Sequence, residues 1–246
     1  MIGLLATAAL ALEPAPADVA KHPFGSRAPI VENFSSAIQS GWDMQHYEIN
    51  ADFDLNVRAV DTEIRMVALS RRDSPGTLTL HANGPVISEV RVSGVAAEYT
   101  LVGQEVRVPM PNVSQGDEVE VTVVSSAGLG SGEDLGVHWD GQTLFSFHEP
   151  QGARLWLVTY DDPSDKATLE WNITVDSSLV VAANGVHTGT SEASNGKSTW
   201  NFVFDELIAT YLFVVHASDY VILEDQMSDG RLIVHHIRPG TESDAW

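Results

Sequence analysis

The sequence predicts an all-β domain, a large antiparallel β-sandwich, and three observations support this prediction. Apolar and polar side chains alternate from residue 47 to residue 55, which is the period of two expected of a half-buried strand. The same alternation recurs in short runs along the chain, with turn-forming residues between them. No stretch of twelve or more residues shows a helical apolar period. Packed sheets are the architecture that buries such runs.

The predicted strands follow one another at short intervals. They cover residues 45–55, 60–69, 77–81, 87–93, 98–102, 105–108 and 118–124, and later 169–175, 180–182, 200–204, 211–216 and 231–237. Glycine, proline and aspartate separate the early runs, for example at Ser74-Pro75-Gly76. The pair Asn184-Gly185 predicts a tight turn, and residues 191–196 predict a loop.

Composition excludes several classes of function. The 246 residues are 43% apolar, which is enough for a sizeable core, and they include no cysteine, so disulfides and thiolate metal sites are excluded. The formal net charge of -21 argues against nucleic acid and anionic lipid as partners, because both require a cationic surface. A solvated acidic surface is the simplest interpretation, and attraction of cationic peptides is the alternative.

The first twenty residues differ from the rest. Residues 2–12 form an apolar run of the length of a signal-peptide core, too short to span a bilayer, so no stable membrane insertion is expected. Residues 15–17 fit a cleavage site, but the first basic residue is Lys21. We interpret residues 1–20 as a signal peptide or an apolar arm and residues 21–41 as a lead-in segment. A signal would make the protein periplasmic or secreted, and a buried arm would leave it cytoplasmic.

Residues 145–168 contain the most specific motif. Its centre is Glu149-Pro150, followed by Gly152-Ala153-Arg154 and by Tyr160-Asp161-Asp162-Pro163-Ser164-Asp165-Lys166-Ala167. Together with residues 180–185 and 207–213, it resembles the N-terminal domain of the aminopeptidase N family of zinc metallopeptidases, the gluzincin aminopeptidases. The resemblance implies a saddle-like β-domain over residues 42–225. It also implies that residues 226–246 hold the last strand and the start of the connection to a catalytic domain.

The zinc-binding motif of that family is absent from these 246 residues. It reads His-Glu-x-x-His on one helix, and no two of the nine histidines have that spacing. His148-Glu149 begins like the motif, but Pro150 would break a helix and Gly152 stands at the fifth position. The family's Gly-Ala-Met-Glu-Asn segment is also absent. We therefore expect a chain without cofactor that is inactive alone and whose partner is its own catalytic domain, where zinc is expected.

The resemblance implies roles for particular residues. Glu149 corresponds to the glutamate that binds the free α-amine of a peptide substrate, and Phe147 would form a wall of the pocket for the first side chain. Arg154, Asp162 and Pro163 are expected to be structural, as parts of an ion-pair and turn network.

Other interpretations of the sequence remain open. A calcium loop at Asp161, Asp162 and Asp165 lacks the regular spacing of such loops, and His235 and His236 would point to opposite faces of a strand. The tryptophans could form a sugar-binding platform, although core packing is simpler. The alternative for the whole chain is a stand-alone β-sandwich binding module, or a paralogue without catalysis.

Overall fold

A computed structural model describes residues 41–131 and 134–241, and these residues form an all-β structure, as predicted. The expected signal or arm at 1–20 and the lead-in up to residue 40 lie outside the described residues. The strands are β1 (Trp42–Asp54), β2 (Ala59–Ser70), β3 (Thr77–His81), β4 (Val86–Val92), β5 (Val95–Ala96), β6 (Thr100–Val102), β7 (Glu105–Pro109), β8 (Glu118–Gly128), β9 (Gly136–Trp139), β10 (Leu144–Phe147), β11 (Ala167–Asp176), β12 (Val180–Ala183), β13 (Val186–Glu192), β14 (Lys197–Ile208), β15 (Val215–Ser218), β16 (Val221–Gln226) and β17 (Leu232–Ile237). Three short 3-10 helices accompany them: η1 (Ala153–Leu155), η2 (Ser194–Gly196) and η3 (Thr210–Leu212).

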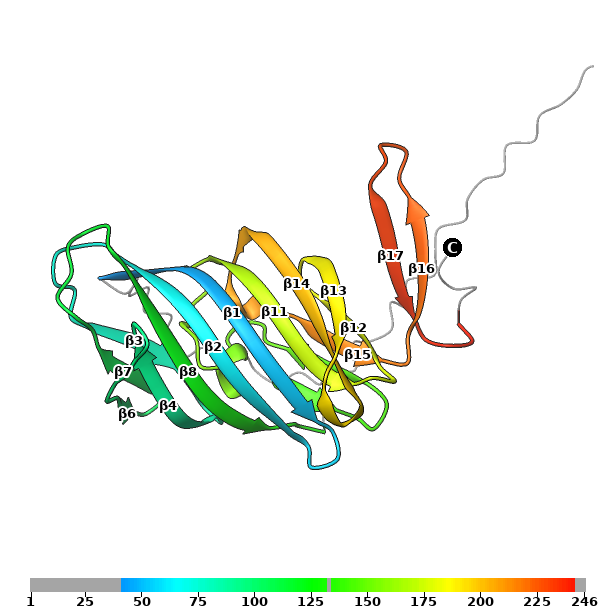
Figure 1. The fold of residues 1–246 in the computed structure, drawn as a ribbon, viewed down its shortest axis with the longest axis horizontal. Coiled ribbons are helices and arrows are strands. Elements are labelled where there is room, and N and C mark those ends of the chain that lie inside the picture. The colour runs from blue at the N-terminus through cyan, green and yellow to red at the C-terminus, as the bar shows by residue number, and fades with distance from the viewer. Residues whose placement is uncertain (1–40, 132–133, 242–246) are drawn as a thin grey trace, which may run out of the picture. The chain divides into compact units, whose positions relative to one another are not determined.

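The strands form four sheets. Figure 1 shows the broadest, an eight-stranded sheet in the order β13-β14-β11-β1-β2-β8-β4-β5. A four-stranded sheet has the order β12-β15-β10-β9, a three-stranded sheet has β3-β7-β6, and β16 and β17 form a hairpin. Neighbouring strands are antiparallel except β1 and β11, which pair in parallel with Tyr47 opposite Leu169. A long stretch of chain separates these two strands, so no tight turn fixes their relative direction.

Alternation along the strands builds the core. In β1 the side chains of Tyr47, Ile49, Ala51 and Phe53 are buried, while the residues between them face outward. Buried side chains from the eight-, four- and three-stranded sheets join one apolar cluster. The largest of its fully buried members are Trp42, Trp156, Trp171, Tyr47, Phe53 and Phe213.

The turn at Asn184-Gly185 is present, but it connects two different sheets rather than two paired strands. It leads from β12 in the four-stranded sheet to β13 at the edge of the eight-stranded sheet. Gly185 has a φ of +98°, and a Cβ there would lie 2.3 Å from the carbonyl oxygen of Val203. Only glycine fits at this position, where two backbones meet.

One predicted strand is wrong in its first half. Over residues 211–216 the structure has the end of the helix η3 (Thr210–Leu212), and strand β15 begins only at Val215. The side chain of Asn184 accepts a hydrogen bond from the Val214 amide (2.5 Å) and donates one to the Leu212 carbonyl (3.0 Å). These bonds hold the segment in a bend that its apolar composition does not reveal.

Candidate functional site

Glu149 lies on the loop that follows β10. Phe147 ends the strand with its side chain 37% exposed, His148 is buried, and Glu149 is exposed. This alternation results from extended backbone, in which successive side chains point to opposite faces. The peptide bond between Glu149 and Pro150 is cis. The carboxylate of Glu149 therefore faces solvent beside a residue that is fixed in the core.

The buried side chain of His148 holds the loop to the core. Its Nε2 accepts a hydrogen bond of 2.7 Å from the indole Nε1 of Trp156, so the ring proton is on Nδ1. Burial lowers the pKa of His148 to about 4, and the imidazole is neutral at physiological pH. The Gly152 amide donates to the His148 carbonyl at 2.5 Å, and a Cβ on Gly152 would lie only 2.7 Å from the His148 Cα. The chain thus closes tightly over the imidazole.

A buried ion pair holds the second half of the loop. The Nε of Arg154 donates to Oδ2 of Asp161 at 2.9 Å, and Nη2 of Arg154 donates to the Asp161 carbonyl oxygen at 2.6 Å. The other carboxylate oxygen of Asp161 accepts from the hydroxyl of Thr210 at 2.8 Å. The side chains of Arg154 and Asp161 are 11% and 0% exposed. Removing one partner of such a buried pair typically costs roughly 3–5 kcal/mol of stability.

Asp162 and Pro163 form the turn that follows. Oδ1 of Asp162 accepts hydrogen bonds from both the amide and the hydroxyl of Ser164, at 2.8 and 2.7 Å. Pro163 is half-buried. Aspartate before proline favours this kind of turn because its side chain bonds to the backbone two residues on.

The sequence indicated an ion-pair network here but not its members. The partner of Arg154 is Asp161, and neither Thr210 nor His81, whose Nδ1 accepts from the Asp161 amide at 3.1 Å, could be assigned to it from spacing. A run of two adjacent aspartates gives no signal for which one is buried. Tyr160 is buried, but the alternation of side chains around it does not show whether Asp161 or Asp162 points into the core.

The three aspartates do not converge on a cation site. Asp161 pairs with Arg154, Asp162 caps its own turn, and Oδ2 of Asp165 accepts from the Met44 amide at 3.3 Å. Within residues 41–131 and 134–241, no group of three or more His, Cys, Asp or Glu side chains could hold a metal ion. In the same part of the chain, no helix is long and apolar enough to cross a membrane.

Comparison with known proteins identifies the family. A family model described as the peptidase M1 N-terminal domain matches residues 43–212. The chain belongs to this family. The match includes the Glu149 loop and the Arg154–Asp161 pair, and it ends before the hairpin of β16 and β17. No curated protein sequence matches the chain.

Solved structures of M1 enzymes share the fold. The M1 zinc metallopeptidase from Deinococcus radiodurans has a TM-score of 0.71 at 22% identity over 82% of this chain. A mutant from the same organism, bound to a Tyr-Ser-Ala substrate, gives 0.70 at 21% identity over 84%. The Legionella pneumophila aminopeptidase A complex with aspartic acid gives 0.73 at 19% identity over 82%. Our chain spans 49%, 52% and 25% of these three proteins.

Proposed function

We propose that this chain is the substrate-anchoring part of a zinc-dependent aminopeptidase and that Glu149 binds the free α-ammonium group of the peptide. The observation that carries this proposal is the exposed carboxylate of Glu149 on a loop whose neighbours are locked into the core. An aminopeptidase has to recognise a terminal ammonium group. A carboxylate at a fixed position does so by charge pairing and sets where the first peptide bond lies.

Rigidity of the loop supports this role. Within residues 147–161, His148 is hydrogen-bonded to Trp156, whose indole stacks on Trp171 with ring centroids 6.1 Å apart. The Arg154–Asp161 pair fixes the far end of the same loop. A binding group has to be held to within a fraction of an ångström, and packed neighbours provide this better than a free loop.

Phe147 lies two residues before Glu149 and is 37% exposed at the end of β10. We propose that its ring forms one wall of the pocket for the first side chain of the substrate. An apolar wall favours apolar residues over polar ones, by roughly 1–3 kcal/mol for a well-fitting side chain. Phe147→Gln should therefore lower kcat/KM for leucyl substrates relative to seryl substrates.

The zinc ion would be held by a second domain, and the hairpin of β16 and β17 is a surface that such a domain could cover. On one face Ile222, Leu232 and Val234 are 42%, 60% and 43% exposed, and on the other Leu223 and Ile233 are only half-buried. A two-stranded hairpin is marginally stable in water by itself, and this one has apolar side chains among the polar ones on both faces. We therefore propose that it packs against the zinc-binding half.

The test is the Glu149→Gln substitution in the protein that combines this chain with its zinc-binding half. Loss of a charge pair in a partly desolvated site costs roughly 2–5 kcal/mol, so kcat/KM for aminoacyl anilides should fall by about one to three orders of magnitude. Zinc content should not change, because we expect the metal ligands to lie in the zinc-binding half.

Glu98→Gln is the matched control, since Glu98 is an exposed glutamate between strands β5 and β6. This variant should keep full activity. Equal activity of the Glu149 and Glu98 variants would refute the anchoring role. An inactive product with no bound zinc would instead favour a stand-alone binding module.

A further inference from the structure

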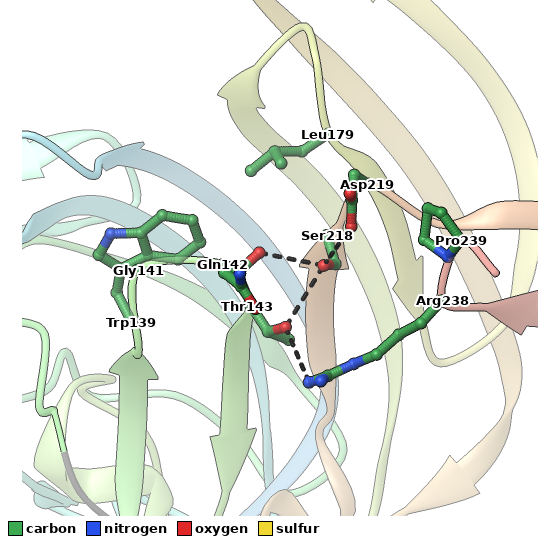
Figure 2. A pocket seen from close by; sticks show the side chains of 9 residues that line it. All are labelled: Trp139, Gly141, Gln142, Thr143, Leu179, Ser218, Asp219, Arg238 and Pro239. Atoms are coloured by element: carbon green, nitrogen blue, oxygen red, sulfur yellow. Dashed lines mark hydrogen bonds between the residues drawn. The ribbon is translucent and has the colours of Figure 1, made fainter. Parts of the chain in front are cut away.

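A hollow of about 420 Å³ lies where four segments of the chain meet. They are the turn between β9 and β10, the turn between β11 and β12 with Leu179, the end of β15, and the residues that follow β17 (Figure 2). Pockets for small ligands begin at roughly 300 Å³, so this one can hold a molecule of several non-hydrogen atoms. Glu149 is not among its lining residues.

Arg238 supplies a positive charge at one side of the hollow. Figure 2 shows its side chain reaching across to Thr143, and its Nη2 lies 3.3 Å from the Thr143 hydroxyl oxygen. Thr143 is buried, so this contact fixes the guanidinium group. Among the residues that the structure describes, Arg238 forms no ion pair, and most of its N–H donors remain free for a ligand.

Asp219 supplies a negative charge at another side. The hydroxyl oxygen of Ser218, which is 1% exposed, lies 3.2 Å from Oδ1 of Asp219 and 3.0 Å from the Gln142 carbonyl oxygen, and its single proton can be donated to either of them. The same hydroxyl is 3.3 Å from the hydroxyl of Thr143. With the Ser218 proton donated to Asp219, a row of hydrogen bonds runs from the guanidinium group through Thr143 and Ser218 to the carboxylate (Figure 2).

The surrounding charges select against a simple anion. Arg238, Asp140 and Asp219 all act on the phenol of Tyr220: burial is the main reason that the pKa of this group is raised, Arg238 lowers it, and the two carboxylates raise it. Two negative charges thus lie near one positive charge, in a chain with a net charge of -21. An anion would be repelled on approach, whereas a zwitterion has no net charge and can pair with both signs.

Apolar groups complete the site. Trp139 and Leu179 line the hollow opposite Arg238, and Pro239 lies beside it (Figure 2). Trp139 is half-buried and Leu179 is 9% exposed, so both present fixed surfaces. An indole face is suited to packing against an aliphatic or aromatic side chain.

We propose that this pocket binds a free amino acid with an apolar side chain, with its carboxylate on Arg238, its ammonium group on Asp219 and its side chain against Trp139 and Leu179. The site is separate from the Glu149 loop. Thr143 precedes β10 and Glu149 follows it, and six residues of extended chain span roughly 20 Å.

The experiment is a titration of the ¹⁵N-labelled 246-residue chain with L-leucine, followed by two-dimensional NMR. Saturable shifts are expected at the amides of Gln142, Thr143, Ser218 and Asp219, with a Kd on the order of 1 mM for so small a ligand. N-acetyl-L-leucine lacks the ammonium group and L-leucinamide lacks the carboxylate. Each should bind at least tenfold more weakly.

Two substitutions and two matched controls locate the ligand. Arg238→Met and Asp219→Asn should each weaken L-leucine binding at least tenfold, with the rest of the spectrum unchanged. Arg231→Met removes an exposed arginine that pairs with Asp229 in the hairpin turn, and it should have no effect. Glu149→Gln should also have no effect.

Three results would overturn the proposal. The first is no saturable shift up to the solubility limit of leucine. The second is equal binding of N-acetyl-L-leucine, which would make the site a weak anion site. The third is a set of shifts confined to residues 147–151 that vanishes in Glu149→Gln. That result would place the amino acid at the anchoring glutamate and support the proposed function while refuting this second site.

Discussion

Asp165 has a half-buried carboxyl group beside the start of β1. Burial raises its pKa from 3.8 to about 7, against the opposing effect of the hydrogen bond from the Met44 amide. Between about pH 4 and pH 7 the folded chain therefore keeps a proton on Asp165 that the unfolded chain has lost. Stability rises with pH only where the unfolded state binds more protons, so Asp165 lowers stability as pH rises through this range.

Asp165→Asn should remove this effect, because the amide stays neutral and can still accept from Met44. We expect the variant and the original chain to have similar unfolding free energies near pH 4 and the variant to be more stable at pH 8, by on the order of 2–4 kcal/mol. Urea denaturation at pH 4, 6 and 8 measures the difference. His81 and His148, with pKa values lowered to about 4 by burial, contribute equally to both proteins and cancel. A difference that does not vary with pH would contradict the assignment.

At the scale of residues, the sequence predicted where the loop lies but not which side chains contact one another inside it. The motif around Glu149 predicted the position of the residue that we propose as the substrate anchor, since Glu-Pro followed by Gly-Ala-Arg is a specific pattern. It did not show that Asp161 pairs with Arg154, because Thr210 and His81, the residues that complete the site of Asp161, are 49 and 80 positions away. It gave no sign of the pocket at Arg238, whose lining residues come from four distant segments.

At the scale of elements, the sequence predicted the long strands and some short ones, such as β3 and β12, but missed β9, β10, β13 and β16. The strands β1, β2, β8 and β11 each have enough residues for a period of two to be recognised. The strands β9 and β10 have four residues each and show no clear alternation of apolar and polar residues in the sequence. Nearly all side chains of β13 are exposed, so hydrogen bonding to a neighbour rather than burial defines this strand. Alternation signals burial of one face and cannot report an exposed edge strand.

The turn between β12 and β13 gives a test at this scale. Gly185→Ala should destabilise the chain by on the order of 3 kcal/mol or more, because the new Cβ meets the Val203 carbonyl at 2.3 Å in a left-handed backbone. Gly94→Ala is the matched control: its φ is +77°, but nothing lies within 4 Å of the added Cβ, so about 1 kcal/mol is expected. Thermal unfolding of both variants measures the difference in lost stability. Equal losses of stability would mean that the backbone around residue 185 shifts to make room for the added Cβ.

At the scale of the whole molecule, the main feature is the excess of negative charge. The chain has 34 acidic and 13 basic residues, and among the described residues most ion pairs are exposed, as at Arg65–Glu48 and Arg107–Glu105. Exposed pairs contribute roughly 0–1 kcal/mol each. We expect repulsion among the acidic groups to outweigh these pairs and to destabilise the compact state.

Salt should stabilise this protein. Raising sodium chloride from about 0.01 M to about 0.15 M shortens the Debye length from roughly 30 Å to 8 Å, which screens the repulsion. We expect Tm to rise by several degrees, measured by circular dichroism at neutral pH. Potassium chloride at equal ionic strength should give the same rise. A fall in Tm with either salt would show that the ion pairs contribute more than the repulsion costs.

The parallel pairing of β1 with β11 also has a consequence for synthesis on the ribosome. Tyr47 pairs with Leu169, so one side of β1 has no partner until about 120 further residues have been translated. At roughly 5–20 residues per second, that interval lasts about 6 to 24 seconds. During this time the growing chain presents an open strand edge of the kind that recruits other strands. A chaperone that shields the nascent chain over this interval would raise the yield of folded protein.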